Sequence, residues 1–349
     1  MRLFIFLLIF TGCSSTKKVE VKKEDVQKSN QSLLSDFNID EKVIEKFNTP
    51  PESEVIEEEP SKPEIQKPIK KPLPEKKFIT PKQSIKKEEK KDSIYPENFP
   101  EKLKKFDVNT ENFWKNLNPV YIENETLVLD IGYLGVSTGT IEIKTMPKTK
   151  VNNLDVYHYH AEIHTADFYS YLYEVHDFCD SYLDVRTMNP VKFSLIQRQS
   201  SQDVDALQLF DQSKMEVVSL YKRVSKEKDT VKKKKREKSI PLRYQDPFSV
   251  FQFLRALPLK VGDHYEIPVV NKGDVELIVI DVEGIEDIKS ILGTKQSIKI
   301  TALSKHKSKR VKSAKMFFWY TNDEKRILLK FQADTKIGKV DGTLKEYDS

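Results

Sequence analysis

Short runs of alternating apolar and polar residues fill most of the chain after residue 120. In the run TLVLDIGY (126–133), Leu127, Leu129 and Ile131 recur at every second position, the spacing that a half-buried β-strand requires. Short turns separate neighbouring runs, so we expect antiparallel pairing in one curved sheet or a partly open barrel. The predicted strands are 126–133, 138–146, 154–165, 170–186, 191–198, 205–211, 215–222, 264–270, 274–283, 296–303, 315–321, 326–335 and 339–346.

Two segments have helical spacing instead. Residues 101–118 are predicted as a helix before the first strand. In 247–257, apolar side chains recur every three or four positions, Asp246 is placed to cap the helix, and Pro247 suits its first turn. We expect this amphipathic helix to pack on the sheet, either as plain core or as a lid over an apolar cavity.

The first fifteen residues, MRLFIFLLIFTGCSS, have the layout of a signal peptide (1–12). Arg2 precedes an apolar run at 3–10 that is too short to span a bilayer. The ending Thr-Gly-Cys resembles the lipobox of bacterial lipoproteins, which implies that Cys13 is acylated and becomes the first residue of the mature chain. Because Ser14 follows the cysteine, we expect a lipid-anchored outer-membrane protein that faces the periplasm. An ordinary signal peptide with a chance cysteine is the alternative.

Residues 13–100 have the composition of a tether. From residue 14 to residue 100 there are 18 Lys, no Arg, 18 acidic residues, ten prolines and no glycine. Such a segment buries too little apolar surface to order itself, so we predict a disordered, extended linker. The stretch 32–47 has near-helical apolar spacing and is interpreted as a transient helix in this tether, with a docking motif as the alternative. Residues 101–349 then form the β-rich envelope domain.

A series of residues along this domain resembles a known family. The series comprises Tyr133, Gly135, Gly139, Tyr173, Asp177, Phe178, Ser181, Asp184, Pro190, Phe193, Gln245, Asp246, Pro247, Leu254, Arg255, Leu257, Pro258, Leu259, Gly262, Asp263, Trp319, Asp323 and Arg326. Their order resembles the exported bacterial family catalogued as domain of unknown function 3108, over about residues 124–347. The resemblance implies an all-β envelope domain and brings no established activity or catalytic residue.

One motif matches a hydrolase signature. Gly135, Ser137 and Gly139 fit the G-x-S-x-G nucleophile elbow, which works only where a strand ends and a helix begins. Here the strand alternation continues, so the glycines are interpreted as a bend in a strand. With no better nucleophile or acid–base pair, we expect a protein that is not an enzyme and has no cofactor and no metal site.

Histidines gather on one predicted strand, 154–165. His158, His160, Glu162 and His164 share one face because alternate residues point the same way. His158 and His160 have the spacing to chelate a divalent ion, whereas His164 would lie about 13 Å from His160. We favour a solvated polar face.

The run HDFCD (176–180) contains three types of metal ligand. Only His176 with Asp180, or Asp177 with Cys179, share a face, and a structural polar network is the interpretation we favour. Cys179 is the sole cysteine besides Cys13, and we expect it to be buried.

Two strongly basic segments are predicted as loops. Residues 222–238 have ten basic and three acidic side chains, and 305–315 have six basic ones and no acidic one. Candidate contacts with an anionic lipid, glycan or envelope protein are Lys232, Lys233, Lys234, Lys235, Arg236, Lys307, Lys309 and Arg310. Solvated hairpin loops are the alternative, and an exported chain is not expected to meet nucleic acid.

The sequence therefore predicts a non-catalytic outer-membrane lipoprotein whose tether holds a β-domain that acts as a binding or scaffold module. The alternative is a lipid or glycolipid carrier with an apolar cavity under helix 247–257.

Overall fold

The computed structural model describes residues 23–40, 45–48, 94–305, 315–335 and 338–349. Its strands form one antiparallel sheet in the order β8-β7-β6-β5-β4-β3-β2-β1-β14-β13-β12-β11-β10-β9, which confirms the predicted mainly-β fold with a single large sheet. The strands are β1 (Thr126–Tyr133), β2 (Val136–Val151), β3 (Leu154–Thr165), β4 (Val175–Asp184), β5 (Pro190–Gln199), β6 (Gln202–Asp211), β7 (Glu216–Ser225), β8 (Thr230–Ser239), β9 (His264–Asn271), β10 (Asp274–Ser290), β11 (Gly293–Lys305), β12 (Lys315–Thr321), β13 (Leu328–Thr335) and β14 (Gly338–Asp348). The helices are α2 (Lys23–Asp36), α4 (Glu101–Trp114), α5 (Asp167–Ser170) and α6 (Ser249–Ala256).

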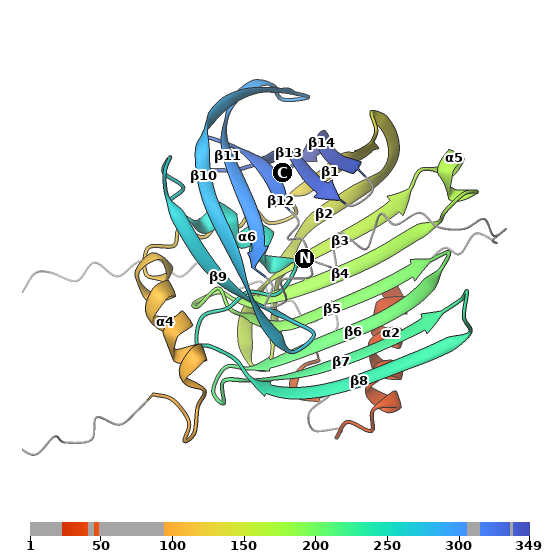
Figure 1. The fold of residues 1–349 in the computed structure, drawn as a ribbon, viewed down its shortest axis with the longest axis vertical. Coiled ribbons are helices and arrows are strands. Elements are labelled where there is room, and N and C mark those ends of the chain that lie inside the picture. Colours follow the sequence, from red (N-terminus) through yellow and green to blue (C-terminus); the bar gives the residue numbers. More distant parts are fainter. Residues whose placement is uncertain (1–22, 41–44, 49–93, 306–314, 336–337) are drawn as a thin grey trace, which may run out of the picture.

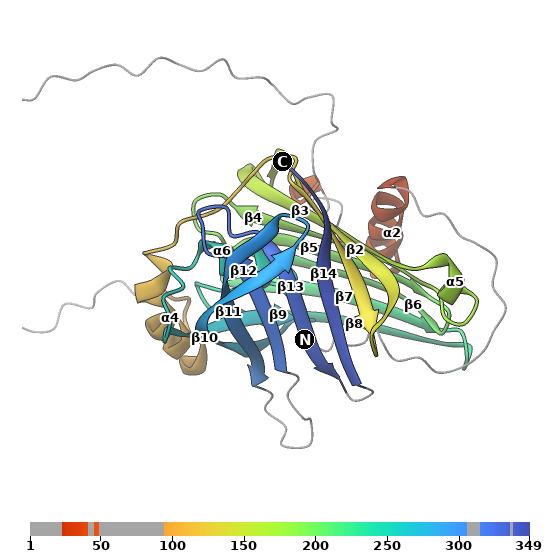
Figure 2. The same cartoon turned by 90° about the horizontal axis from the view of Figure 1, so that it is seen from above.

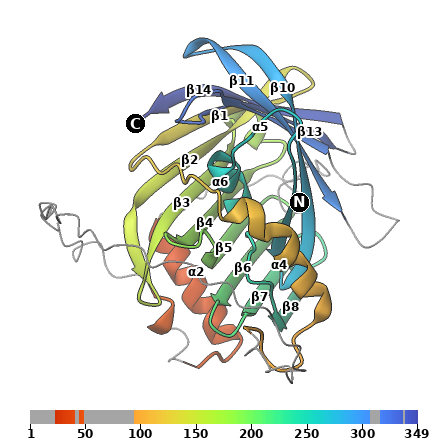
Figure 3. The ribbon, with the colours of Figure 1, turned by 90° about the vertical axis from the view of Figure 1, so that its left-hand side faces the viewer.

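The sheet curves so that its two halves face each other with α6 between them (Figures 1 and 3). Strand β1 pairs with β14, so the first and last strands lie side by side in the middle of the sheet. On the inner face, Gln208 of β6 bonds across to the other half. Its amide donates to the carbonyl of Val270 at 3.1 Å and accepts from the Gly273 N–H at 3.0 Å. Strands β8 and β9 are left as the two edges of the sheet.

Helix α6 fills the space between the two halves. One carboxylate oxygen of Asp246 accepts from the N–H groups of Phe248, at 2.8 Å, and Ser249, at 2.7 Å, so Asp246 caps the first turn as predicted, although the helix starts at Ser249 and not at residue 247. Phe253 and Leu254 are at most 1% exposed and pack in one cluster with residues of both halves. These contacts favour the core interpretation of the helix over the lid.

A buried ion pair fixes the helix in place. Arg255 donates to the two carboxylate oxygens of Glu125 at 2.6 and 2.9 Å, and also to the carbonyl of Lys325 at 2.7 Å. Both charged side chains are almost fully buried, so each needs the other. The pair therefore joins α6 to the start of β1 and to the turn before β13.

The structure differs from the predicted tether at its first described residues. Helix α2 lies on the outer face of β5, β6 and β7 (Figures 2 and 3). Leu33 is 1% exposed and packs with Leu34, Phe47 and Leu207 in a second apolar cluster. The predicted disorder is therefore wrong for this part of 13–100, and the docking-motif alternative describes it better. The signal peptide and Cys13 lie outside the described residues.

Residues 222–238, predicted as a basic loop, mostly form strands in the structure. Residues 222–225 complete β7, and 230–239 form the edge strand β8, which pairs with β7 along its whole length. The side chains of β8 are exposed on both faces, so no apolar alternation reveals the strand. Lysines on an exposed edge also discourage pairing with other chains. The loop prediction for 222–238 is therefore wrong.

Other predicted boundaries also need correction. The predicted strand 170–186 begins only at Val175, because residues 167–170 form the short helix α5, where Ser170 Oγ donates to the carbonyl of Asp167 at 2.7 Å. The predicted helix 101–118 is confirmed as α4, which ends at Trp114. None of the described helices has the length and apolar character needed to cross a bilayer.

Candidate functional site

The outer face of β3 and β4, beside α2, carries two histidine–carboxylate groups. In the antiparallel register, His160 lies opposite Asp180 and His164 lies opposite His176. Side chains at directly opposed positions share a face and touch. We call Asp180 with His158 and His160 the Asp180 group, and Glu162 with His164 and His176 the Glu162 group.

The Asp180 group is buried, and its three ligand atoms do not all lie within 4.8 Å of one another. One carboxylate oxygen of Asp180 accepts from His158 Nε2 at 2.7 Å and from His160 Nδ1 at 3.0 Å, and the His158 ring stacks on Tyr182 with centroids 4.2 Å apart. Burial raises the pKa of Asp180, but the hydrogen bonds and charges of the two rings outweigh it and hold this pKa well below its usual value. Burial alone would lower the pKa of His160. The hydrogen bond to Asp180 outweighs this effect, so the pKa of His160 is raised. The two rings bind the carboxylate, so the chelation that the spacing of His158 and His160 allows does not describe the site.

In the Glu162 group, the two histidine nitrogens and a carboxylate oxygen converge. His164 Nε2 lies 2.7 Å and His176 Nε2 lies 2.8 Å from the same oxygen of Glu162, and the two ring centroids are 4.1 Å apart. Half-burial raises the pKa of Glu162, but the bonds from both histidines outweigh it and lower this pKa well below its usual value. Among the described residues, this is the one group of three His, Cys, Asp or Glu ligand atoms that lie within 4.8 Å of one another.

The predicted solvated face is wrong for this surface. The side chains of His158 and His160 are only 12% and 17% exposed, because their rings pack on aromatic side chains of β4. His176 and Asp180 do share a face, as their spacing predicts, but His176 binds Glu162 across the strand pair. The sequence missed the joining of His164 with His176, since parity within one strand says nothing about the register between two.

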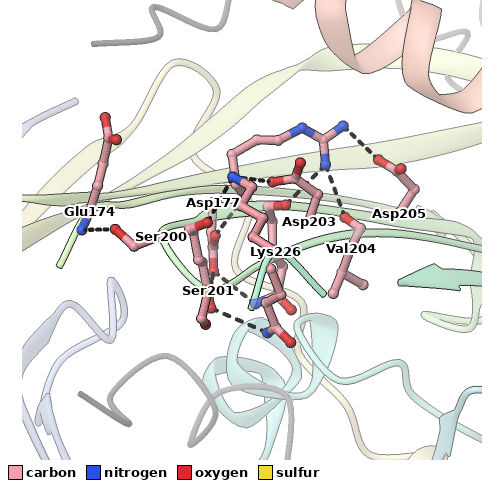
Figure 4. Close-up of polar contacts among 12 residues, drawn as sticks. Glu174, Asp177, Ser200, Ser201, Asp203, Val204, Asp205 and Lys226 are labelled. Carbon is pink, nitrogen blue, oxygen red and sulfur yellow. Dashed lines mark hydrogen bonds and ion pairs between the residues drawn. The ribbon is translucent and has the colours of Figure 1, made fainter. Parts of the chain in front are cut away.

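The inner face of β4 carries the predicted polar network. Asp177 accepts from the side-chain amides of Gln197 at 2.8 Å and Gln199 at 2.7 Å, and burial raises its pKa to about 6. Figure 4 shows Asp177 among its neighbours at this end of β4, β5 and β6, where Lys226 pairs with Asp203 at 2.9 Å. The interpretation of 176–180 as structural is consistent with these bonds.

Cys179 lies on the same inner face and is buried, as predicted. Burial, together with the nearby carboxylates, raises the pKa of its thiol well above the usual value.

The G-x-S-x-G segment is a turn followed by a strand. Gly135 has φ +80°, a backbone conformation that favours glycine, and β2 starts at the next residue. A Cβ on Gly139 would lie 2.3 Å from the carbonyl oxygen of His164 on β3, so only glycine fits there. The register of β2 against β1 shifts between Ser137 and Gly139, which confirms the predicted bend or bulge, and Ser137 donates to Asp130 at 2.6 Å.

The basic residues predicted at 232–236 form a row along the exposed edge strand β8. Lys233 pairs with Asp36 of α2, Lys235 with Glu237, and Arg236 with Asp274. Lys232 and Lys234 are exposed and have no ion-pair partner among the residues that the structure describes. The other predicted contacts, Lys307, Lys309 and Arg310, lie outside those residues.

Comparisons with known proteins give a family and several distant solved structures. One similar structure is a β-barrel-like protein of domain of unknown function DUF1849 from Brucella abortus, with 10% identity over 64% of this chain and 96% of that chain and a TM-score of 0.43. Another is a candidate lipoprotein from Parabacteroides distasonis, with 10% identity over 67% and 99% of the two chains and a TM-score of 0.27. A third is a candidate exported protein with a YmcC-like fold from Bacteroides fragilis, with 9% identity over 67% and 100% and a TM-score of 0.27.

No curated protein matches the chain. The family described as protein of unknown function (DUF3108) matches residues 128–345, more than half of the chain. This span contains strands β2 to β13 complete and helix α6 with its Asp246 cap and its buried Arg255. The chain therefore belongs to the DUF3108 family.

Proposed function

We propose that this chain is a non-catalytic, lipid-anchored binding module of the bacterial outer membrane that faces the periplasm. Acyl chains on Cys13 hold it at the membrane, and its folded domain contacts an anionic membrane surface through strand β8. The observation that carries the proposal is the row of basic side chains on this edge strand, six among its ten residues.

The position of β8 suits contact with a surface. An edge strand has a neighbour on one side only, so its side chains are accessible, and every residue of β8 is exposed or half-exposed. Lys232 and Lys234 lie opposite Arg223 and Tyr221 of β7, so they point to the same face of the sheet and add to the charge of Arg223. Each lysine near an anionic leaflet contributes about 1 kcal/mol of attraction.

The anchor explains why weak attraction is enough. A protein that is already attached to the membrane meets its surface at high effective concentration, so a contact of a few kcal/mol is occupied much of the time. Attraction of this kind weakens as salt screens the charges.

The test uses a Cys13→Ala chain, which lacks the acylation site, so that membrane association reports on charge alone. Co-sedimentation is measured with vesicles that contain phosphatidylglycerol and with vesicles of phosphatidylcholine only. The K232S/K234S variant should bind the anionic vesicles about tenfold or more weakly, from the loss of two lysines. These lysines have no ion pair within the described chain, so folding should be unaffected.

The matched control is K289S/K295S, which removes two exposed lysines from the β10–β11 hairpin. It should bind the anionic vesicles as well as the parent chain does. Equal losses in the two variants, or no preference for phosphatidylglycerol, would contradict the role of β8. Labelling with a clickable fatty acid that is not lost in Cys13→Ala would contradict the anchor.

A further inference from the structure

We propose that the Glu162 group binds a divalent transition-metal ion, with Zn²⁺ as the ion that its ligand set fits. The ligands are Glu162 and His164 from β3 and His176 from β4. The inference rests on their geometry and is independent of the proposed membrane contact.

The three ligand atoms already converge. Both Nε2 atoms lie 2.7–2.8 Å from one oxygen of Glu162, and all three atoms are within 4.8 Å of one another. Zinc binds imidazole nitrogen and carboxylate oxygen at about 2.0–2.2 Å, which places tetrahedral ligands about 3.3 Å apart. The two nitrogen–oxygen distances therefore need to lengthen by only about half an ångström to accept an ion.

The strands hold these atoms in place. Glu162 and His164 are two residues apart, so they lie on the same face of β3, and His176 is directly opposite His164 in the register. The His176 ring also packs against Phe178, with centroids 4.4 Å apart, which limits its rotation. A preformed arrangement of this kind loses little conformational entropy on binding.

The chemical types of the three ligands determine which class of ion the group prefers. Two imidazoles and one carboxylate suit zinc and other first-row divalent ions, whereas calcium and magnesium prefer oxygen ligands throughout. Zinc binds imidazole in its neutral form, so in the metal-bound state Nε2 of each ring would face the ion and the ring proton would be on Nδ1. The His164 side chain is 42% exposed, against 11% for His176, so a fourth position is open to water on the His164 side.

The charges around the group permit a cation. Arg198 lies opposite His176 in the register, but its guanidinium donates to Asp205 at 2.7 Å and to the carbonyl of Val204 at 3.3 Å. Its charge is therefore matched on β6 and does not point at Glu162. The neighbouring Lys144 pairs with Glu142 at 2.8 Å.

The Asp180 group provides an internal control. It has the same composition, two histidines on one carboxylate, and lies two to four residues away along the same pair of strands. Its nitrogen atoms nevertheless do not come together within 4.8 Å, since the His158 ring stacks on Tyr182 instead. The Asp180 group therefore lacks the convergence of three ligand atoms that a metal site needs, and the Glu162 group has it.

The experiment is calorimetric titration of ZnCl₂ into the full, detergent-solubilised chain, purified without a histidine tag. We expect one saturable site per chain. Loss of an outer-shell partner already weakens metal sites about 10- to 100-fold, so loss of a ligand in His164→Gln should weaken zinc binding at least tenfold. His158→Gln, in the Asp180 group, should leave zinc binding unchanged.

His164 is the residue to replace because it is the most exposed of the three, and circular dichroism of His164→Gln should match the parent chain. A second readout is the visible absorption of bound Co²⁺, which reports on the ligand field and should be lost in the same variant. No saturable zinc binding, or an equal loss in His158→Gln and His164→Gln, overturns the proposal.

Discussion

Strand β4 has a buried aspartate against each of its two faces, and the pKa values of the two are shifted in opposite directions. Asp180 on the outer face bonds to His158 and His160, whereas Asp246 on the inner side accepts from Ser181 Oγ and from two backbone N–H groups. Burial raises the pKa of both, but the histidines reverse this for Asp180, whose pKa is lowered, while the pKa of Asp246 rises to about 6. The charge of a partner, more than depth, decides the protonation state of a buried carboxyl group.

The opposite pKa shifts of Asp180 and Asp246 reflect two different structural roles. Around Asp180, a negatively charged carboxylate accepts hydrogen bonds from two imidazole rings, so the outer face depends on contacts to a charge. Around Asp246, neutral donors cap α6 and join it to β4, so the inner face depends on packing and neutral hydrogen bonds. The predictions below test this division from the largest effect to the smallest.

Replacing Asp180 should cost the most stability. Asp180→Asn removes the charge that both rings bind while they stay mostly buried, and loss of one partner in a buried pair costs about 3 kcal/mol. The measurement is urea-induced unfolding of the domain at neutral pH.

The matched variant is Glu162→Gln, measured with a chelator present so that no metal contributes. Glu162 also holds two histidines but is half-exposed, so its contacts are partly screened and the variant should lose about 1 kcal/mol or less. Equal losses in the two variants would show that burial of Asp180 adds nothing to its ionic contacts.

The strand pattern explains how much of this fold the sequence predicts. Strands packed on one face show alternation, so β1, β3 and β12 are predicted with the bounds that the structure has. Strand β8 has no buried face, and its pairing comes from backbone bonds to β7 that no side-chain period records. Edge strands of this kind are therefore invisible to a hydrophobic pattern.

The two histidine–carboxylate groups are also predictable only in part, because side-chain spacing does not reveal how neighbouring strands pair. The spacing within β3 places Glu162 and His164 on one face, and that within β4 does the same for His176 and Asp180. The contact between His164 and His176 depends on the register of the two strands, which a shift by one residue would destroy. For α2, the spacing at 32–47 indicates a helix, but the linker composition around it hides the packing of Leu33 and Leu34 on the sheet.

A smaller effect is expected from pH, through Asp246. Its folded pKa of about 6 lies above its ordinary value of 3.8, so between these values the folded state keeps a proton that the unfolded state has lost. Stability should therefore fall as pH rises through this window, by about 1 kcal/mol from Asp246 between about pH 5 and pH 7. Asp180 has the opposite shift, so its contribution is lost only as pH falls below 3.8.

The check is the free energy of unfolding across that range for the parent chain and for Asp246→Asn. Asparagine caps helices about as well as aspartate but does not titrate, so the variant should have a flatter profile. Asp177 has a pKa raised to about 6 as well, so the slope should shrink and not vanish. An unchanged slope would mean that Asp246 is ionised throughout and that its neutral donors suffice to hold the charge.

The smallest effect is expected at Cys179, which lies on the inner face of β4 next to Asp180 in the sequence. Cys179→Ala removes one buried heavy atom from the inner face, a loss comparable to one methylene, or about 0.8 kcal/mol. The thiol itself should be inert in the folded chain, because thiolate is the reactive form and burial beside carboxylates raises its pKa. In a Cys13→Ala chain, a thiol reagent should therefore label Cys179 only at the rate of unfolding. Fast labelling of the folded protein would mean that the inner face opens to solvent, and that the neutral environment inferred for Asp246 is not dry.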